Sequence, residues 1–221
     1  MKLKLLIFLI FFSVQSQTKL PEGFVYVKTI IPSIKIDLRY CSTNNFIGKP
    51  IDGYNKEVLI LSKEATIALK NVQDELQAYN LSVMVYDAYR PPRAVNHFVR
   101  WAKDLNDTIN KHYYYPDVPK TELFKREYIA SRSGHSKGST VDITLVDNTT
   151  CEPLDMGSSY DFFGKKSWVS NRKLTAQQLA NRMLLQSLMR KHGFRHYPQE
   201  WWHFTLRNEP FPNTYFDFNV E

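Results

Sequence analysis

The chain has 221 residues, of which 43% are hydrophobic and 23% are charged, and its formal net charge is +7. This length and composition suit one globular domain with its own core, and they exclude a disordered or fibrous protein. The basic residues are scattered among acidic ones, without the stripe of cations and aromatic residues that indicates a nucleic-acid groove. We therefore expect no nucleic-acid partner.

The N-terminus has the layout of a secretory signal peptide. Lys2 and Lys4 precede an apolar run over residues 5–14, and a small-residue cleavage pattern follows. The run falls well short of the roughly 20 residues that span a bilayer, and no other stretch is apolar enough. We expect a signal peptide at 1–16 and one domain at 17–221 that is exported, periplasmic or secreted, without stable membrane insertion. Losing two lysines lowers the net charge from +7 to +5, which suits a solvated basic surface, with weak cell-wall association as the alternative.

The two cysteines of the chain are Cys41 and Cys151. Two cysteines are too few for a zinc site built from thiolates alone. In an exported protein they can form a disulfide, and we favour that pairing although the sequence does not place them side by side.

The first half of the chain predicts a strand, a loop, a helix, a strand and a second helix. Residues 34–40 alternate between apolar and polar, as in a half-buried strand, and residues 41–57 are rich in turn signals. Ser62 caps a helix that runs to about Tyr79, because apolar residues recur there every three or four positions. Residues 81–87 are a buried strand, and the prolines that follow open a helix over 93–105.

The second half adds a surface excursion, a strand, a long helix and two more strands. Residues 106–119 are polar and tyrosine-rich, which indicates an excursion that can act as a lid. Residues 140–146 alternate as a strand, and a capping box opens a helix over 175–193. The last strands are expected at 194–197 and 202–206. Without a regular βαβ rhythm, we predict an α+β single domain with a central, mostly antiparallel sheet packed by helices.

Two distant stretches carry the candidate catalytic residues. His135 and Asp142 flank a loop whose two glycines let the backbone fold back, so both side chains can converge. His203 offers a second imidazole, and Glu200 offers a second carboxylate. A catalytic zinc site typically has three protein ligands, an open position for water and a nearby base. The pattern therefore predicts a zinc hydrolase with its site at the sheet edge.

Two placements stay open at this stage. Glu200 and His203 are three residues apart, which on a regular strand would point them to opposite faces, so we expect Glu200 to belong to the preceding loop. Arg90 follows a predicted strand. It is either a surface arginine held by two prolines or a fixed cation aimed at the oxyanion of a tetrahedral intermediate.

From about Ile36 onwards the chain resembles the zinc D-alanyl-D-alanine dipeptidases of the vancomycin-resistance type. The matching segments, in order, are Asp37–Tyr40, Asn45–Pro50, Asp87–Pro91, Arg93–Asn96, Ser133–Asp142, Met156–Asp161, Glu200–His203 and Pro212–Phe218. So many separate matches in the same order make the resemblance specific.

The resemblance implies one Zn²⁺ with three protein ligands, His135, Asp142 and His203. It also implies Glu200 as the catalytic base and Arg90 as the stabiliser of the transition state. A third implied set holds the free amino group of the substrate and consists of Tyr40, Ser133 and Asp161. The resistance enzymes are cytoplasmic, whereas this chain carries an apparent export signal. Cys41 also follows the amine-binding tyrosine directly.

The predicted function is zinc-dependent hydrolysis of the dipeptide D-Ala-D-Ala to two D-alanines, by zinc-bound water that Glu200 activates. The nearest alternative is a zinc D,D-carboxypeptidase or endopeptidase acting on peptidoglycan stem peptides. Such an enzyme needs an open groove, and Asp161 and the excursion at 106–119 argue against it. The second alternative is a non-catalytic cell-wall binding module, which would need neither Glu200 nor Arg90.

Overall fold

The computed structural model describes residues 19–221. The expected signal peptide and its boundary with the domain lie outside these residues. Within residues 19–221 no helix is both long and apolar enough to cross a membrane.

A five-stranded sheet organises the molecule. Its strand order is β2 (Lys35–Ile36), β4 (Leu81–Asp87), β5 (Thr140–Asp147), β7 (Glu200–Leu206) and β6 (Phe194–Tyr197). β2 runs parallel to β4, and every other neighbouring pair is antiparallel. A separate two-stranded sheet pairs β1 (Phe24–Tyr26) with β3 (Ile60–Ser62). The predicted α+β domain with a mostly antiparallel sheet is confirmed.

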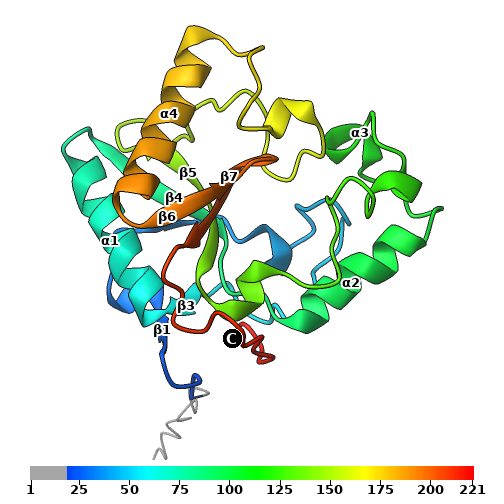
Figure 1. The fold of residues 1–221 in the computed structure, drawn as a ribbon, viewed down its shortest axis with the longest axis horizontal. Coiled ribbons are helices and arrows are strands. Elements are labelled where there is room, and N and C mark those ends of the chain that lie inside the picture. The colour runs from blue at the N-terminus through cyan, green and yellow to red at the C-terminus, as the bar shows by residue number, and fades with distance from the viewer. Residues whose placement is uncertain (1–18) are drawn as a thin grey trace, which may run out of the picture.

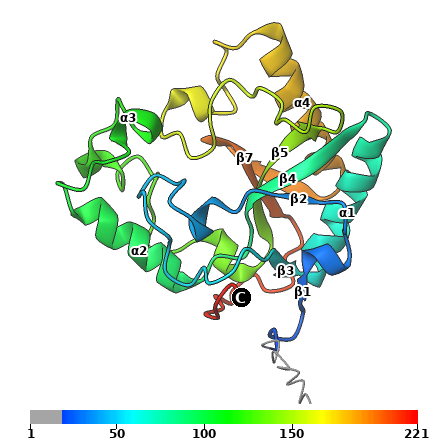
Figure 2. The ribbon, with the colours of Figure 1, turned by 180° about the vertical axis from the view of Figure 1, so that it is seen from behind.

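Four α-helices flank the sheet. Helices α1 (Lys63–Gln77) and α4 (Ala176–Lys191) lie together on one side of it, while α2 (Pro92–Lys103) and α3 (Lys111–Tyr114) lie on the other side (Figures 1 and 2). The short 3₁₀ helices are η1 (Val27–Thr29), η2 (Arg39–Cys41), η3 (Lys120–Glu122), η4 (Gly134–Lys137) and η5 (Lys165–Ser167). The space between the sheet and the α2–α3 side holds the candidate site.

Local sequence signals fix where the two long helices begin. The Ser62 hydroxyl accepts a hydrogen bond from the amide of Ala65 at 3.4 Å, which caps α1. Thr175 and Gln178 form the predicted capping box of α4, with bonds of 3.2 and 2.9 Å. Both helix starts are therefore confirmed.

The first predicted strand is shorter than the alternation suggests. Only Lys35 and Ile36 are strand, and the amide of Asp37 makes a further bond to the carbonyl of Val85 at 3.0 Å. The chain then turns into η2, where the Arg39 side chain folds back onto the Asp37 carboxylate at 2.8 Å. This turn buries Tyr40, which is 1% exposed, in the molecule's interior.

The predicted disulfide is wrong, because Cys41 and Cys151 are both free. Topology gives the reason. Cys41 follows β2 and therefore lies toward the Asp87 end of β4, since β2 and β4 are parallel. Cys151 follows β5, whose last residue, Asp147, pairs with Leu81 at the opposite end of β4. The two thiols are thus separated by the length of a strand.

Candidate active site

Three potential metal ligands converge at one end of the sheet. The Nδ1 atom of His203 is 3.0 Å from Oδ1 of Asp142, and Nε2 of His135 is 3.3 Å from each of those two atoms. Within the described chain this is the one group of His, Cys, Asp or Glu residues whose geometry could hold a metal ion. Asp142 and His203 pair directly across β5 and β7. Because these strands are interior, the site lies at the edge formed by strand ends.

The η4 turn fixes the orientation of His135. The Ser133 hydroxyl caps this turn by accepting a hydrogen bond from the His135 amide at 3.3 Å. Gly138 ends it with a left-handed φ of 78°. The ring nitrogen Nδ1 of His135 lies 2.7 Å from the carbonyl of Ala88 and must donate its proton there. Nε2 is therefore left with a lone pair that faces the cluster, as a metal-binding histidine requires.

The Asp142 carboxylate shows that this cluster fits a divalent cation. Its Oδ2 atom accepts a bond from Tyr160 at 3.1 Å and faces Arg90 at 3.5 Å. Its Oδ1 atom is buried without a hydrogen bond of normal geometry, although two imidazole nitrogens are close. A carboxylate oxygen left free between two imidazole nitrogens is the donor set of a catalytic zinc site. The residues present therefore fit Zn²⁺.

The pKa shifts of Asp142 and His203 also indicate a site that fits a metal cation. Burial acts to raise the pKa of Asp142, but the two imidazoles outweigh burial and hold that pKa well below its usual range. Burial acts to lower the pKa of His203, and the adjacent Asp142 carboxylate reverses this, so the pKa is raised. The carboxylate thus stays ionised and ready to bind a cation.

Glu200 belongs to β7, so the expectation that it lies in the preceding loop is wrong. His196 of β6 pairs with Phe204, whereas the next residue, Tyr197, pairs with Glu200. Three residues of β7, at positions 201–203, therefore have no pairing partner between these two positions of β6. This irregularity breaks the strict alternation of side chains between the two faces of β7. Oε2 of Glu200 consequently lies 3.4 Å from Nδ1 of His203, on the same side of the strand.

Glu200 has the acid–base properties of a catalytic base. Its side chain is 20% exposed and lines the cavity described below. Burial raises the pKa of Glu200 to about 7, with Asp142 adding to the effect and His203 and Arg90 opposing it. A carboxylate with a pKa near neutrality can both accept a proton and return it.

Arg90 is held inside the site and is not a surface arginine. Its Nε atom donates to Oδ2 of Asp87 at 2.8 Å, and its guanidinium lies 5.2 Å from the ring centres of Tyr40 and Phe98. Asp87 is itself fully buried, accepts a bond from Tyr54 at 2.5 Å and lies 3.4 Å from Nδ1 of His135. Burial acts to lower the pKa of Arg90, but Asp87 and its neighbours raise it, so the cation is permanent.

The three residues assigned to the substrate amine line the same cavity. The Tyr40 hydroxyl donates to Oδ2 of Asp161 at 2.8 Å, and the Tyr160 hydroxyl, which lies 3.1 Å from Oδ2 of Asp142, is also 3.1 Å from the Tyr40 oxygen. Ser133 lines the cavity at the start of η4. Asp161 has a φ of 57°, a strained value for a residue other than glycine, of the kind that clusters at functional sites. Burial raises the pKa of Asp161 well above its usual range, and Asp142 adds to this.

One cavity of about 250 Å³ collects every predicted site residue. Its lining includes Tyr40, Arg90, Ser133, His135, Asp142, Asp161, Glu200 and His203. The predicted lid at 106–119 contributes no residue to this lining. The rim comes instead from residues 127–134.

Two supporting residues escaped the sequence analysis. Asp87 could have been found as a carboxylate at the end of a buried strand, three residues before Arg90. Tyr160 gives no such signal, because its contacts to Tyr40 and Asp142 arise from the path of a long loop.

Comparison with known proteins identifies relatives of the whole domain. The sequence profile of the peptidase M15 family described as D-Ala-D-Ala dipeptidase matches residues 21–221. A D-alanyl-D-alanine dipeptidase of Enterococcus faecium is 37% identical over 199 residues, covering 90% of this chain and 98% of that protein. One of Streptomyces coelicolor is 40% identical over 197 residues, covering 89% of this chain and 98% of that protein. Among solved structures, the LdcB LD-carboxypeptidase aligns with a TM-score of 0.44 at 15% identity, covering 87% of this chain and 72% of that one.

A profile match over nearly all described residues, and relatives of this identity that align along almost their full length, agree with the resemblance noted in the sequence. The chain is a metallopeptidase that belongs to the D-Ala-D-Ala dipeptidase family of the M15 peptidases.

Proposed function

We propose that this protein hydrolyses the dipeptide D-Ala-D-Ala to two D-alanines with one Zn²⁺ held by His135, Asp142 and His203. The observation that carries the proposal is the shared cavity of about 250 Å³, in which the metal cluster, Glu200, Arg90 and Asp161 all face one small volume. The relatives at 37% and 40% identity are dipeptidases of that specificity.

The protein's own residues divide the chemistry among them. Bound zinc supplies Lewis acidity, which acidifies water and polarises a peptide carbonyl. Glu200 takes the proton of the attacking water and passes it to the leaving amine, for which a pKa of about 7 is well matched. Arg90, oriented by Asp87, presents a fixed cation to the oxyanion that develops on the carbonyl.

The amine end of the cavity sets the length of the substrate. We assign the free ammonium to the Asp161 carboxylate, with Tyr40 and Ser133 beside it. Asp161 is 7% exposed, so an ammonium paired with it is largely removed from water. An acylated nitrogen would leave this carboxylate buried without its charged partner, a mismatch that typically costs a few kcal/mol. This need for a free ammonium favours the dipeptidase over a carboxypeptidase or endopeptidase, and the presence of Glu200 and Arg90 favours an enzyme over a binding module.

Metal analysis of purified variants tests the assignment. His135→Ala and His203→Ala each remove one of three protein ligands and should empty the site. Glu200→Gln should keep zinc and lose turnover of D-Ala-D-Ala, because this residue acts as a base. Stoichiometric zinc in both histidine variants would overturn the metal site. Equal cleavage of D-Ala-D-Ala and of a pentapeptide stem by the wild type would replace the dipeptidase with its carboxypeptidase alternative.

A further inference from the structure

We propose that Arg182 is a positioning residue that acts through Asp161, by holding the segment 156–168 in the conformation that presents this carboxylate to the substrate's ammonium. The inference rests on the proposed function for the identity of the substrate. It assigns a role in selectivity to a side chain on α4 that does not line the cavity.

The guanidinium of Arg182 joins the two ends of this segment. Nε donates to the carbonyl of Met156 at 2.6 Å, at the segment's start. Nη2 donates to the carbonyl of Lys166 at 2.8 Å and Nη1 to that of Trp168 at 3.1 Å, at its end. One planar donor group thus ties both ends of the segment to α4, beside the hydroxyl contact of 3.0 Å that joins Ser158 to Ser167 within it.

Keeping this cation buried is unfavourable, which argues that its contacts matter. Arg182 is 2% exposed, and burial lowers its pKa to about 10, an effect that the charge of Asp155 only partly offsets. Its hydrogen-bond partners are neutral carbonyls, where a buried arginine usually has a carboxylate. An apolar residue would pack here without that cost, but it would leave three carbonyls without donors.

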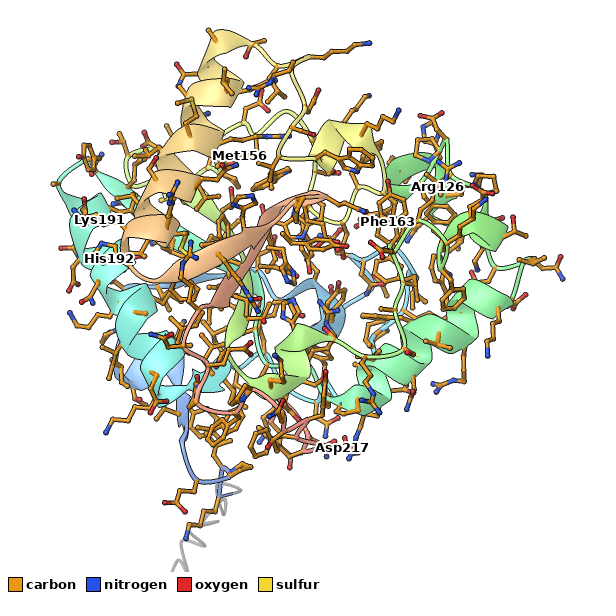
Figure 3. The ribbon with its side chains drawn as sticks, viewed as in Figure 1. Arg126, Met156, Phe163, Lys191, His192 and Asp217 are labelled. Carbon is orange, nitrogen blue, oxygen red and sulfur yellow. The ribbon has the colours of Figure 1, made fainter. Side chains whose placement is uncertain are left out.

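The segment carries the groups that reach the site. Tyr160 and Asp161 lie at its middle, and their contacts run to Tyr40 at 3.1 and 2.8 Å. Figure 3 shows Met156 beside α4 and Phe163 beyond the tip of β7, toward the α2–α3 side. The segment therefore crosses from the helix that carries Arg182 to the cavity, which Phe163 also lines.

The backbone of this segment is strained where Asp161 stands. A left-handed residue other than glycine persists only when its surroundings impose it, and Asp161 has a φ of 57°. Phe163 is held by the Tyr114 carbonyl at 2.7 Å, and we assign a further part of that constraint to the three bonds of Arg182 at both ends. Without these three bonds the backbone gains room to relax toward an ordinary φ, which would turn the carboxylate away from the ammonium.

The expected kinetic signature is therefore specific. Loss of a charge-assisted hydrogen bond to the ammonium raises KM for D-Ala-D-Ala about 10- to 100-fold. It leaves N-acetyl-D-Ala-D-Ala, which has no ammonium, almost unaffected. Zinc content should stay stoichiometric, because the metal ligands come from other elements. The ratio of kcat/KM between the free and the blocked dipeptide should fall accordingly.

A matched control is available in Lys120. It is 6% exposed, and its ammonium donates to the carbonyls of Trp101, Asp104 and Asp107 at 2.6, 2.6 and 2.8 Å. Neither this lysine nor its three partners line the cavity. Lys120→Met should lower thermal stability as Arg182→Met does, and it should leave the selectivity ratio unchanged.

A double-mutant cycle decides the question. We would measure kcat, KM and zinc content for Arg182→Met, Asp161→Ala and the double variant. We expect the double variant to resemble Asp161→Ala alone, since Arg182 has nothing left to position. Additive effects, or an equal loss of selectivity in Lys120→Met, would overturn the inference.

Arg182→Lys keeps the test decisive if the methionine variant fails to fold. An ammonium can still donate to these carbonyls, as Lys120 does elsewhere, so its KM should lie between the wild type and Asp161→Ala. A lysine variant with wild-type selectivity beside an unfolded methionine variant would reduce Arg182 to a stability role. An inactive wild type would refute the proposed function itself, which separates the two failures.

Discussion

Asp87 orients Arg90 and lies beside the ring of His135. Its carboxylate binds Nε of Arg90 at 2.8 Å and lies 3.4 Å from Nδ1 of His135, which points its other nitrogen at the metal cluster. Burial raises the pKa of Asp87, whereas the charges of Arg90 and His135 lower it. Removing either neighbour would therefore favour a neutral Asp87 and loosen the other.

Arg90→Ala should lower kcat and kcat/KM together by about 10²–10³-fold, because the lost cation acts on charge that exists only in the transition state. Steady-state kinetics on D-Ala-D-Ala measure this. Arg93→Ala is the control, since that arginine is exposed and pairs with Asp217 at 2.9 Å. A rise in KM alone for the Arg90 variant would show a substrate clamp instead.

Asp161 should make substrate affinity sensitive to pH. Its pKa is raised well above its usual range by burial, and only the ionised carboxylate pairs fully with an ammonium. Affinity is therefore present above the raised pKa and is lost as the pH falls through it. As the pH is lowered, KM for D-Ala-D-Ala should begin to rise while the pH is still well above 4, where an ordinary aspartate remains ionised. Asp161→Asn should show a nearly flat KM profile, and an identical slope in both proteins would contradict the assignment.

At the scale of elements, the η4 turn depends on a glycine that no other residue can replace. A Cβ atom on Gly138 would lie 2.3 Å from a ring carbon of Phe24, and φ is 78°. Gly193 ends α4 with a φ of 92°, but its Cβ would meet nothing closer than 3.6 Å. A side chain at either position would strain the backbone, but only at Gly138 would it also clash with a neighbouring side chain.

Gly138→Ala should therefore destabilise the protein by about 1–3 kcal/mol or more and weaken zinc binding, because η4 carries His135. Gly193→Ala should lose less stability, because only the unfavourable φ contributes there, and its zinc affinity should be unchanged. Denaturant unfolding and zinc titration of both variants provide the measurement. Equal zinc affinity in the two variants would show that the turn does not control the ligand.

The sequence predicts those features of the structure that neighbouring residues specify, and it fails where a feature depends on how distant strands pair. β4 spans the predicted residues 81–87, and the α4 capping box is confirmed, because neighbouring residues specify both. The position of Glu200 was mispredicted, since the irregularity between β6 and β7 exists only after the strands pair. The pairing of Cys41 with Cys151 failed for the same reason, because strand direction separates them. The eight candidate site residues nevertheless share one cavity. The metal ligands and Glu200 were found from their own pattern, whereas Tyr40, Ser133 and Asp161 were named only through the family resemblance.

At the scale of the whole molecule, export remains our proposal, with a signal peptide at 1–16 and a domain at 17–221. Protein purified from its native host should begin near Gln17, because the charged and apolar order of the first residues suits signal cleavage. Mass spectrometry of the intact protein measures this. An intact Met1 on cytoplasmic protein would contradict export. For an exported enzyme we propose recovery of D-alanine released during cell-wall turnover as its role.

The wide spacing of the metal ligands also bears on how the chain is made. Asp142 and His203 face each other only after β5 and β7 pair, and these strands are separated by more than fifty residues. A growing chain therefore has no complete metal site until residue 203 has left the ribosome, when much of the sheet can already form. We therefore expect metal to bind only after β5 and β7 have paired. Its supply would then lengthen the lifetime of the finished protein by slowing unfolding, and would leave the rate of folding unchanged.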